Sequence, residues 1–216
     1  IQPLASFFLA LLLAPLLPGI INRTKAFFAG RQGPPLLQTY RDLFKLLQKG
    51  AVYSRTTTWL FQAGPVVGLA SAVAALSLVP LGGAPALAAF PGDLILFAYL
   101  LGLMRFFTVL AALDTGSAFE GMGASREVQF SALAEPALLL GLAAVARETS
   151  TLSLSEMFAG LGAEGWGPAA PVLLHVAGAI LIVFLVENAR IPFDDPNTHL
   201  ELTMIHEVMV LDHSGP

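Results

Sequence analysis

The sequence of 216 residues contains no cysteine and few charged residues. Without cysteine, the chain can form no disulfide bond and supplies no thiolate for a zinc ion or an iron–sulfur cluster, so any redox cofactor must belong to a partner. Charged residues make up 12% of the chain and hydrophobic residues 56%, whereas roughly 25% of residues are charged in an average soluble domain. This composition indicates a protein embedded in the lipid bilayer, and we expect no nucleic-acid partner.

Apolar runs recur along the chain, and each is close to the ~20 residues that cross a hydrocarbon core. They predict an all-α fold, a polytopic transmembrane helix bundle that forms a single membrane domain over residues 1–216. Pro15, Pro18 and Gly19 lie near the end of the first run, where we expect a kink or an early exit. The five predicted spans are about 3–21, 59–78, 93–113, 127–146 and 170–186, and an interfacial amphipathic helix is predicted at about 36–48.

Basic residues are distributed unevenly between the predicted loops. Seven of the 11 lie between residues 22 and 58, and Arg126 and Arg190 lie in the loops after the third and fifth spans. The loops after the second and fourth spans carry only Arg147. Because cytoplasmic loops carry an excess of Lys and Arg, we predict that the chain starts outside and that the loop after the fifth span is cytoplasmic.

Arg105 lies near the middle of the third predicted span. An arginine there costs at least ~2.5–3.5 kcal/mol, so it needs an anionic partner. We expect Glu135 in this role, with Asp114 as the second candidate. Glu127, Ser131 and Glu135 are spaced four apart, which places them on one face of the fourth span. Two interpretations remain open, a buried Arg–Glu pair that only holds the helices together and a hydrated proton path.

A polar segment at residues 187–207 follows the fifth span and gathers carboxylates and imidazoles at the membrane boundary. Capping alone would explain parts of it, because Asp195-Pro196 and Thr198-x-x-Glu201 are typical of helix starts. Glu187 and Arg190 are spaced as an ordinary helix-end pair. We expect no metal site, since His199 and His206 would be about 10 Å apart along a helix that starts near Thr198. The gathering of several carboxylates and two histidines at the membrane boundary nevertheless favours proton handling.

Two motifs resemble those of the complex I subunit 1 family. Residues 31–34, Arg-Gln-Gly-Pro, match its Arg-x-Gly-Pro element, and residues 187–194 match its Glu-x-x-Arg-x-Pro-Phe-Asp loop. The sequence is most similar to the hydrogenase-linked branch, typified by formate hydrogenlyase subunit 4 and hydrogenase-4 component C. It departs from the respiratory pattern at Asn197 and His199, which replace acids. The segments that carry this similarity are residues 40–47, 113–117, 123–127 and 198–207.

The resemblance implies a membrane anchor beneath a peripheral [NiFe]-hydrogenase arm in the cytoplasmic membrane of a prokaryote. Expected partners are the large and small hydrogenase subunits, which would hold the nickel–iron centre and iron–sulfur clusters, and antiporter-like membrane subunits. Family members have about eight spans, so the sequence would lack roughly the last three. The alternatives are a quinone-site subunit of an NADH:quinone oxidoreductase and a passive structural anchor. A free-standing transporter is disfavoured because no internal repeat is visible.

We predict no catalytic residue and no cofactor site in this chain, but two sets of functional side chains. Arg105, Arg31, Arg126 and Arg190 would supply countercharge or hold loops. The predicted proton path consists of Glu135, Glu127, Asp114, Glu187, Asp194, Asp195, Glu201, Glu207, His199 and His206.

Overall fold

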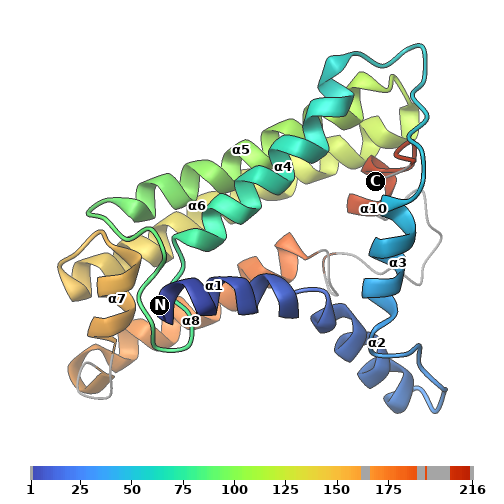
Figure 1. Cartoon of the computed structure of the whole chain (residues 1–216). Helices are drawn as coiled ribbons and strands as arrows, with labels where there is room; N and C mark the ends of the chain where they lie inside the picture. Colours follow the sequence, from blue (N-terminus) through green and yellow to red (C-terminus); the bar gives the residue numbers. More distant parts are fainter. Residues whose placement is uncertain (1, 162–165, 189–192, 194–204, 215–216) are drawn as a thin grey trace. The chain divides into compact units, whose positions relative to one another are not determined.

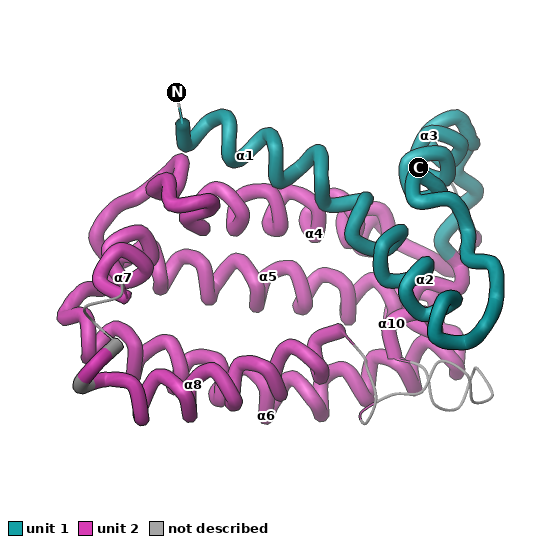
Figure 2. The backbone as a smooth tube through the Cα atoms, turned by 90° about the horizontal axis from the view of Figure 1, so that it is seen from below, with its two compact units in different colours: residues 1–53, 213–216 teal, residues 54–212 magenta. Residues whose placement is uncertain are grey.

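A computed structural model describes residues 2–161, 166–188, 193 and 205–214. Within these ranges the regular elements are α-helices, which confirms the predicted fold class. Contacts between Cα atoms divide the chain into two compact units, residues 1–53 with 213–216 and residues 54–212 (Figure 2). The prediction that residues 1–216 form one membrane domain stays a prediction.

In the first unit, a bent pair of helices replaces the first predicted span. Helix α1 covers Gln2–Leu13, helix α2 covers Leu16–Phe28, and the two meet at an angle of 44°. Pro15 lies at the break, where its ring removes a backbone donor and prevents a straight helix. The expected kink is therefore confirmed, but the helix continues seven residues beyond Ile21, because nothing in the polar residues that follow prevents helical hydrogen bonding.

Helix α3 (Gln38–Leu47) confirms the predicted amphipathic helix within two residues at its start and one at its end. The loop before α3 packs closely on α2. A Cβ atom at Gly19 of α2 would overlap the backbone carbonyl oxygen of Leu36 in this loop. Phe44 and Leu47 are exposed on α3. Its apolar face is thus available to lipid or to another subunit.

In the second unit, four long helices are placed in chain order beside one another (Figure 1). Helix α4 packs on α5, α5 on α6, and α6 on α8, while short α10 contacts α5 and α6. Each long helix is long and apolar enough to cross a membrane, and the bent α1–α2 pair gives a fifth candidate. The bounds are α4 Trp59–Ser77, α5 Asp93–Asp114, α6 Ala118–Thr149, α7 Leu154–Gly160, α8 Trp166–Glu187 and α10 His206–Met209.

Two sequence predictions for this unit were wrong. The fourth span was expected to begin near residue 127, but α6 begins at Ala118, so Glu120 and Glu127 are helical. Gly123 permits α10 to approach this part of α6, since a Cβ atom there would lie 2.9 Å from the Ile205 carbonyl oxygen. The expected loop at 147–168 contains α7. Its start is stabilised by a distant residue, Asp93, whose carboxylate accepts a hydrogen bond of 2.7 Å from the Leu154 N–H.

Candidate functional site: an arginine–carboxylate cluster

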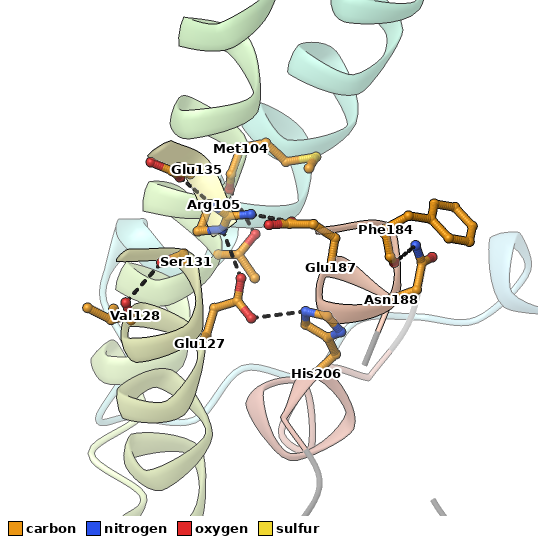
Figure 3. A network of polar contacts seen from close by, with 11 residues as sticks. Met104, Arg105, Glu127, Val128, Ser131, Glu135, Phe184, Glu187, Asn188 and His206 are labelled. Atoms are coloured by element: carbon orange, nitrogen blue, oxygen red, sulfur yellow. Dashed lines mark hydrogen bonds and ion pairs between the residues drawn. The ribbon is translucent and has the colours of Figure 1, made fainter. Parts of the chain in front are cut away.

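Arg105 on α5 binds three carboxylates from two other helices (Figure 3). Its Nε donates to Glu127 Oε1 at 2.8 Å. Its two terminal nitrogens bind different partners, Nη1 contacting Glu135 Oε1 and Nη2 contacting Glu187 Oε2. Each nitrogen of the guanidinium therefore holds one acid. We call these four residues together with His206 the arginine cluster.

The predicted contact between Arg105 and Glu135 is confirmed. Glu127 and Glu135 are eight residues apart on α6, which separates them by about 12 Å along the axis on nearly the same face, and Arg105 reaches both. Sequence reasoning did not identify Glu127 or Glu187 as partners of Arg105. The spacing along α6 predicts that Glu127 and Glu135 lie on one face of this helix. Glu187 comes close to Arg105 only because α8 packs on α6.

His206 extends the cluster towards α10. Its Nε2 lies 3.1 Å from Glu127 Oε2, so the two oxygens of Glu127 are divided between His206 and Arg105. Helix α10 is held in place by the close contact at Gly123 and by a buried apolar group that includes Ala112, Ala124 and Met209. The hydrogen bond with Glu127 raises the pKa of His206 above its ordinary value, while burial opposes this rise.

Charge and exposure differ across the arginine cluster. The side chains of Arg105 and Glu127 are 12% exposed, whereas those of Glu187 and Glu135 are 33% and 46% exposed. One guanidinium faces three carboxylates, so the ionised cluster carries surplus negative charge, and protonated His206 offsets only one of the two excess charges. Such a group can accept protons, and Arg105 can respond electrostatically to each protonation.

The other predicted site residues that the structure describes are not members of the arginine cluster. Asp114, the second expected partner of Arg105, instead caps α4, with its carboxylate accepting from the Thr58 N–H at 2.6 Å and the Phe61 N–H at 3.2 Å. The hydroxyl of Ser131 donates to the Val128 carbonyl. The others are Glu207 (exposed on α10), Arg126 (half-buried on α6) and Arg31 (exposed, in the other unit).

Several predicted site residues lie outside the described part of the chain. They are Arg190, Asp194, Asp195, His199 and Glu201. The start of a helix near Thr198 lies there as well. Among the residues that the structure describes, no three His, Cys, Asp or Glu side chains are placed to hold a metal ion.

Glu120 is buried against a part of the chain that is distant in sequence. Its side chain is fully buried in the first turn of α6, and Oε1 accepts a hydrogen bond of 3.1 Å from the Asp212 N–H. The other oxygen, Oε2, has no partner among the described residues. The pattern Ser117-x-x-Glu120 signals a helix start, but no local pattern predicts burial by the residues around Asp212.

Comparison with known families agrees with this architecture. Residues 1–215 match the family described as NADH dehydrogenase. The chain belongs to this family. Hydrogenase-4 component C of Escherichia coli (strain K12) is 36% identical over 212 residues, and formate hydrogenlyase subunit 4 of the same strain is 35% identical over 206 residues. These alignments cover 98% and 94% of this chain and confirm the resemblance to the hydrogenase-linked branch.

The chain spans 66% of the length of each of these two relatives. An NADH-quinone oxidoreductase subunit of Anaplasma phagocytophilum (strain HZ) is 27% identical, with 87% of this chain and 60% of the relative covered. Among solved structures, a chain of the membrane-bound sulfane sulfur reductase, an archaeal respiratory membrane complex, matches with a TM-score of 0.77 and 28% identity. This match covers 97% of the present chain and 71% of the other. The protein is a multi-span helical membrane protein of this family.

Proposed function

We propose that this protein is the membrane anchor and proton-coupling subunit of a membrane-bound hydrogenase complex related to respiratory complex I. The two Escherichia coli relatives support the hydrogenase assignment by their names and by 35–36% identity. The single observation that supports proton coupling is the arginine cluster, which gathers three carboxylates and an imidazole on membrane-spanning and adjoining helices. A purely structural helix contact needs one acid for one arginine, and here there are three.

The proposed path joins His206 to Glu127 by proton transfer, and Arg105 links Glu127 to Glu135 electrostatically. A proton on His206 can pass to Glu127 through the hydrogen bond of 3.1 Å, because hydrogen-bonded groups of this kind exchange protons directly. Arg105 stays charged throughout. When Glu127 becomes neutral, its hold on Arg105 weakens and Arg105 binds Glu135 and Glu187 more strongly. The arrival of one proton thereby changes the charge balance at the more exposed Glu135.

The redox chemistry in this proposal belongs to the partners. A nickel–iron centre and iron–sulfur clusters in peripheral large and small subunits would reduce protons, because the present chain contains no cysteine to hold them. Antiporter-like membrane subunits would move the ions. The complex would lie in the cytoplasmic membrane of a prokaryote, with the segment at 187–207 on the cytoplasmic side.

The test is hydrogen evolution measured together with ion uptake in inverted membrane vesicles. Glu135→Gln removes the acid at the end of the path, and Glu148→Gln is a matched control on the same helix, where the side chain is exposed. We expect Glu135→Gln to retain hydrogen evolution and to lose most ion uptake, by roughly tenfold or more, as is usual for removal of a proton-transfer group. Glu148→Gln should behave like the wild type.

Two outcomes would replace the proposal. If ion uptake persists in Glu135→Gln, the protein is a passive anchor and the arginine cluster only holds helices together. If the assembled complex evolves no hydrogen but reduces quinone, the protein is a quinone-site subunit, as the name of the Anaplasma phagocytophilum relative would suggest.

A further inference from the structure

A cationic groove lies at the end of α2, in the unit formed by residues 1–53 and 213–216. Its volume is about 580 Å³. Two arginines face it from different segments, Arg23 from the last turns of α2 and Arg31 from the loop that leads to α3. The other lining residues are Phe27, Gln32, Gly33 and Pro35.

The backbone holds the second arginine beside the first. Helix α2 ends in a double hydrogen-bond cap, in which the Arg31 N–H donates to the Ala26 carbonyl at 2.8 Å and the Gly30 N–H donates to the Phe27 carbonyl at 3.1 Å. Gly30 has φ of +65°, which a glycine adopts without strain. The loop then folds back until a Cβ atom at Gly33 would lie 3.1 Å from the Arg23 Cα. The groove is therefore built into the fold.

Neither arginine has an acidic partner in the part of the chain that the structure describes. Residues 1–53 contain six basic side chains and one acid, Asp42, whose carboxylate accepts a hydrogen bond from Gln38. Basic residues near a helix C-terminus also offset the helix dipole, but that effect needs no groove and no second arginine from the following loop. Among the described residues no acid neutralises this positive charge, and an anion from another molecule would do so.

Apolar side chains beside the groove identify the source of that anion. Phe27 and Phe28 are 78% and 82% exposed, and Phe27 itself lines the groove. On the adjoining face of α2, Ile20, Ile21 and Phe28 line a second hollow of about 600 Å³. Arginines beside exposed apolar side chains at a helix end fit a membrane–water interface, because the charged head of each arginine can reach water while its stem lies along apolar surface. A soluble acidic protein surface would leave these rings without apolar neighbours.

We propose that Arg23 and Arg31 bind the phosphate of an anionic phospholipid headgroup, whose acyl chains lie along Phe27, Phe28 and Ile20. A guanidinium presents paired N–H donors that match phosphate oxygens, and Gln32 adds amide donors at the groove wall. The site is independent of the arginine cluster and of any proton path.

The test is native mass spectrometry of the detergent-purified complex, titrated with dioleoyl phosphatidylglycerol or with dioleoyl phosphatidylcholine. The test variant is Arg23→Gln with Arg31→Gln, and the matched control is Lys45→Gln with Lys49→Gln, two exposed basic residues away from the groove. We expect one phosphatidylglycerol to bind roughly thirtyfold more weakly to the test variant. The control should bind it as the wild type does, and phosphatidylcholine should bind weakly to all three.

Equal weakening in both double variants would mean that only diffuse surface charge attracts the lipid, and the proposal would be wrong. Unchanged phosphatidylglycerol binding in the test variant would also overturn it. Loss of a peripheral subunit with lipid binding intact would assign the groove to an acidic protein. Displacement of the lipid by millimolar inorganic phosphate would indicate a site for free phosphate. If the double variant does not assemble, Arg31→Gln alone must weaken binding by roughly fivefold.

Discussion

Arg105 holds three acids because a guanidinium directs its N–H donors outwards from a rigid plane. Each of its three nitrogens binds a different carboxylate, so no acid can leave without exposing a donor in a site where Arg105 is only 12% exposed. A lysine would offer a single point of charge on a flexible stem and could not span Glu127, Glu135 and Glu187 at once. The identity of this one residue therefore determines how three helices meet.

His206 should make the docking of α10 depend on pH. Its pKa is raised by the hydrogen bond that its ring donates to the Glu127 carboxylate on α6, with Glu207 on α10 and Glu187 on α8 adding attraction. The folded protein thus binds the proton more tightly than the unfolded chain, whose histidine has a pKa of about 6.5. The stabilisation is fully present below that pH and is lost as the pH rises through the raised pKa.

We expect amide protection in the peptide around residues 205–212 to fall with rising pH, measured by hydrogen exchange and corrected for its intrinsic pH dependence. In His206→Gln the pH dependence should disappear. Glu207→Gln is the control, because Glu207 attracts His206 without being its hydrogen-bond partner, and it should change the profile less than Glu127→Gln does. A wild-type profile that is flat with pH would contradict the assignment.

Helix crossings in this protein depend on glycines at particular contacts. A Cβ atom at Gly64 on α4 would lie 2.6 Å from the Ala111 Cβ and 3.2 Å from the Phe107 carbonyl oxygen on α5. Small residues allow membrane helices to approach closely, where dispersion contacts between backbones replace the hydrophobic effect. The pairing of α4 with α5 in turn places Asp114 at the start of α4 and keeps it away from Arg105.

Gly64→Ala should destabilise the α4–α5 pair by about 1–3 kcal/mol, because the added methyl group forces the helices apart. Gly68→Ala is a matched control on the same helix, since its Cβ atom would lie 3.9 Å from the Met104 Cγ in ordinary contact. Thermal unfolding of the purified protein should show a lower midpoint for Gly64→Ala only. Equal midpoints for the two variants would show that this crossing is not tightly packed.

Charge is divided between the two parts of the chain. Residues 1–53 carry six basic residues and one acid, whereas residues 54–212 carry five basic and 14 acidic residues. An excess of Lys and Arg keeps a loop on the cytoplasmic side. The predicted orientation therefore depends mostly on the segment that contains the end of α2 and α3.

The absence of cysteine makes this orientation directly measurable. Ala51 and Ala89 are exposed outside the helices, on either side of α4. We expect a membrane-impermeant maleimide to label Ala51→Cys only in inverted vesicles and Ala89→Cys only in right-side-out vesicles. The opposite pattern would reverse the predicted topology, and labelling of both from one side would mean that α4 does not cross the membrane.

Much of the fold was predictable because its signals are local. Apolar runs located α4, α5 and α8 within a few residues, and the prolines near residue 15 located the bend between α1 and α2. Helix starts were harder to predict where the stabilising group lies far away in sequence. Asp93 accepts a hydrogen bond at the start of α7, and α10 packs closely on the first part of α6 at Gly123.

The sequence by itself determined that the chain crosses a membrane, that Arg105 needs an anionic partner and that Glu135 can be that partner. These conclusions follow from hydrophobicity, the cost of burying charge and helical spacing, which are properties of short segments. Only the tertiary structure decided that Glu187 and Glu127 share the same arginine, that His206 joins them and that Asp114 does not. Those contacts join residues 22 to 82 positions apart, and such distances close only when whole helices pack.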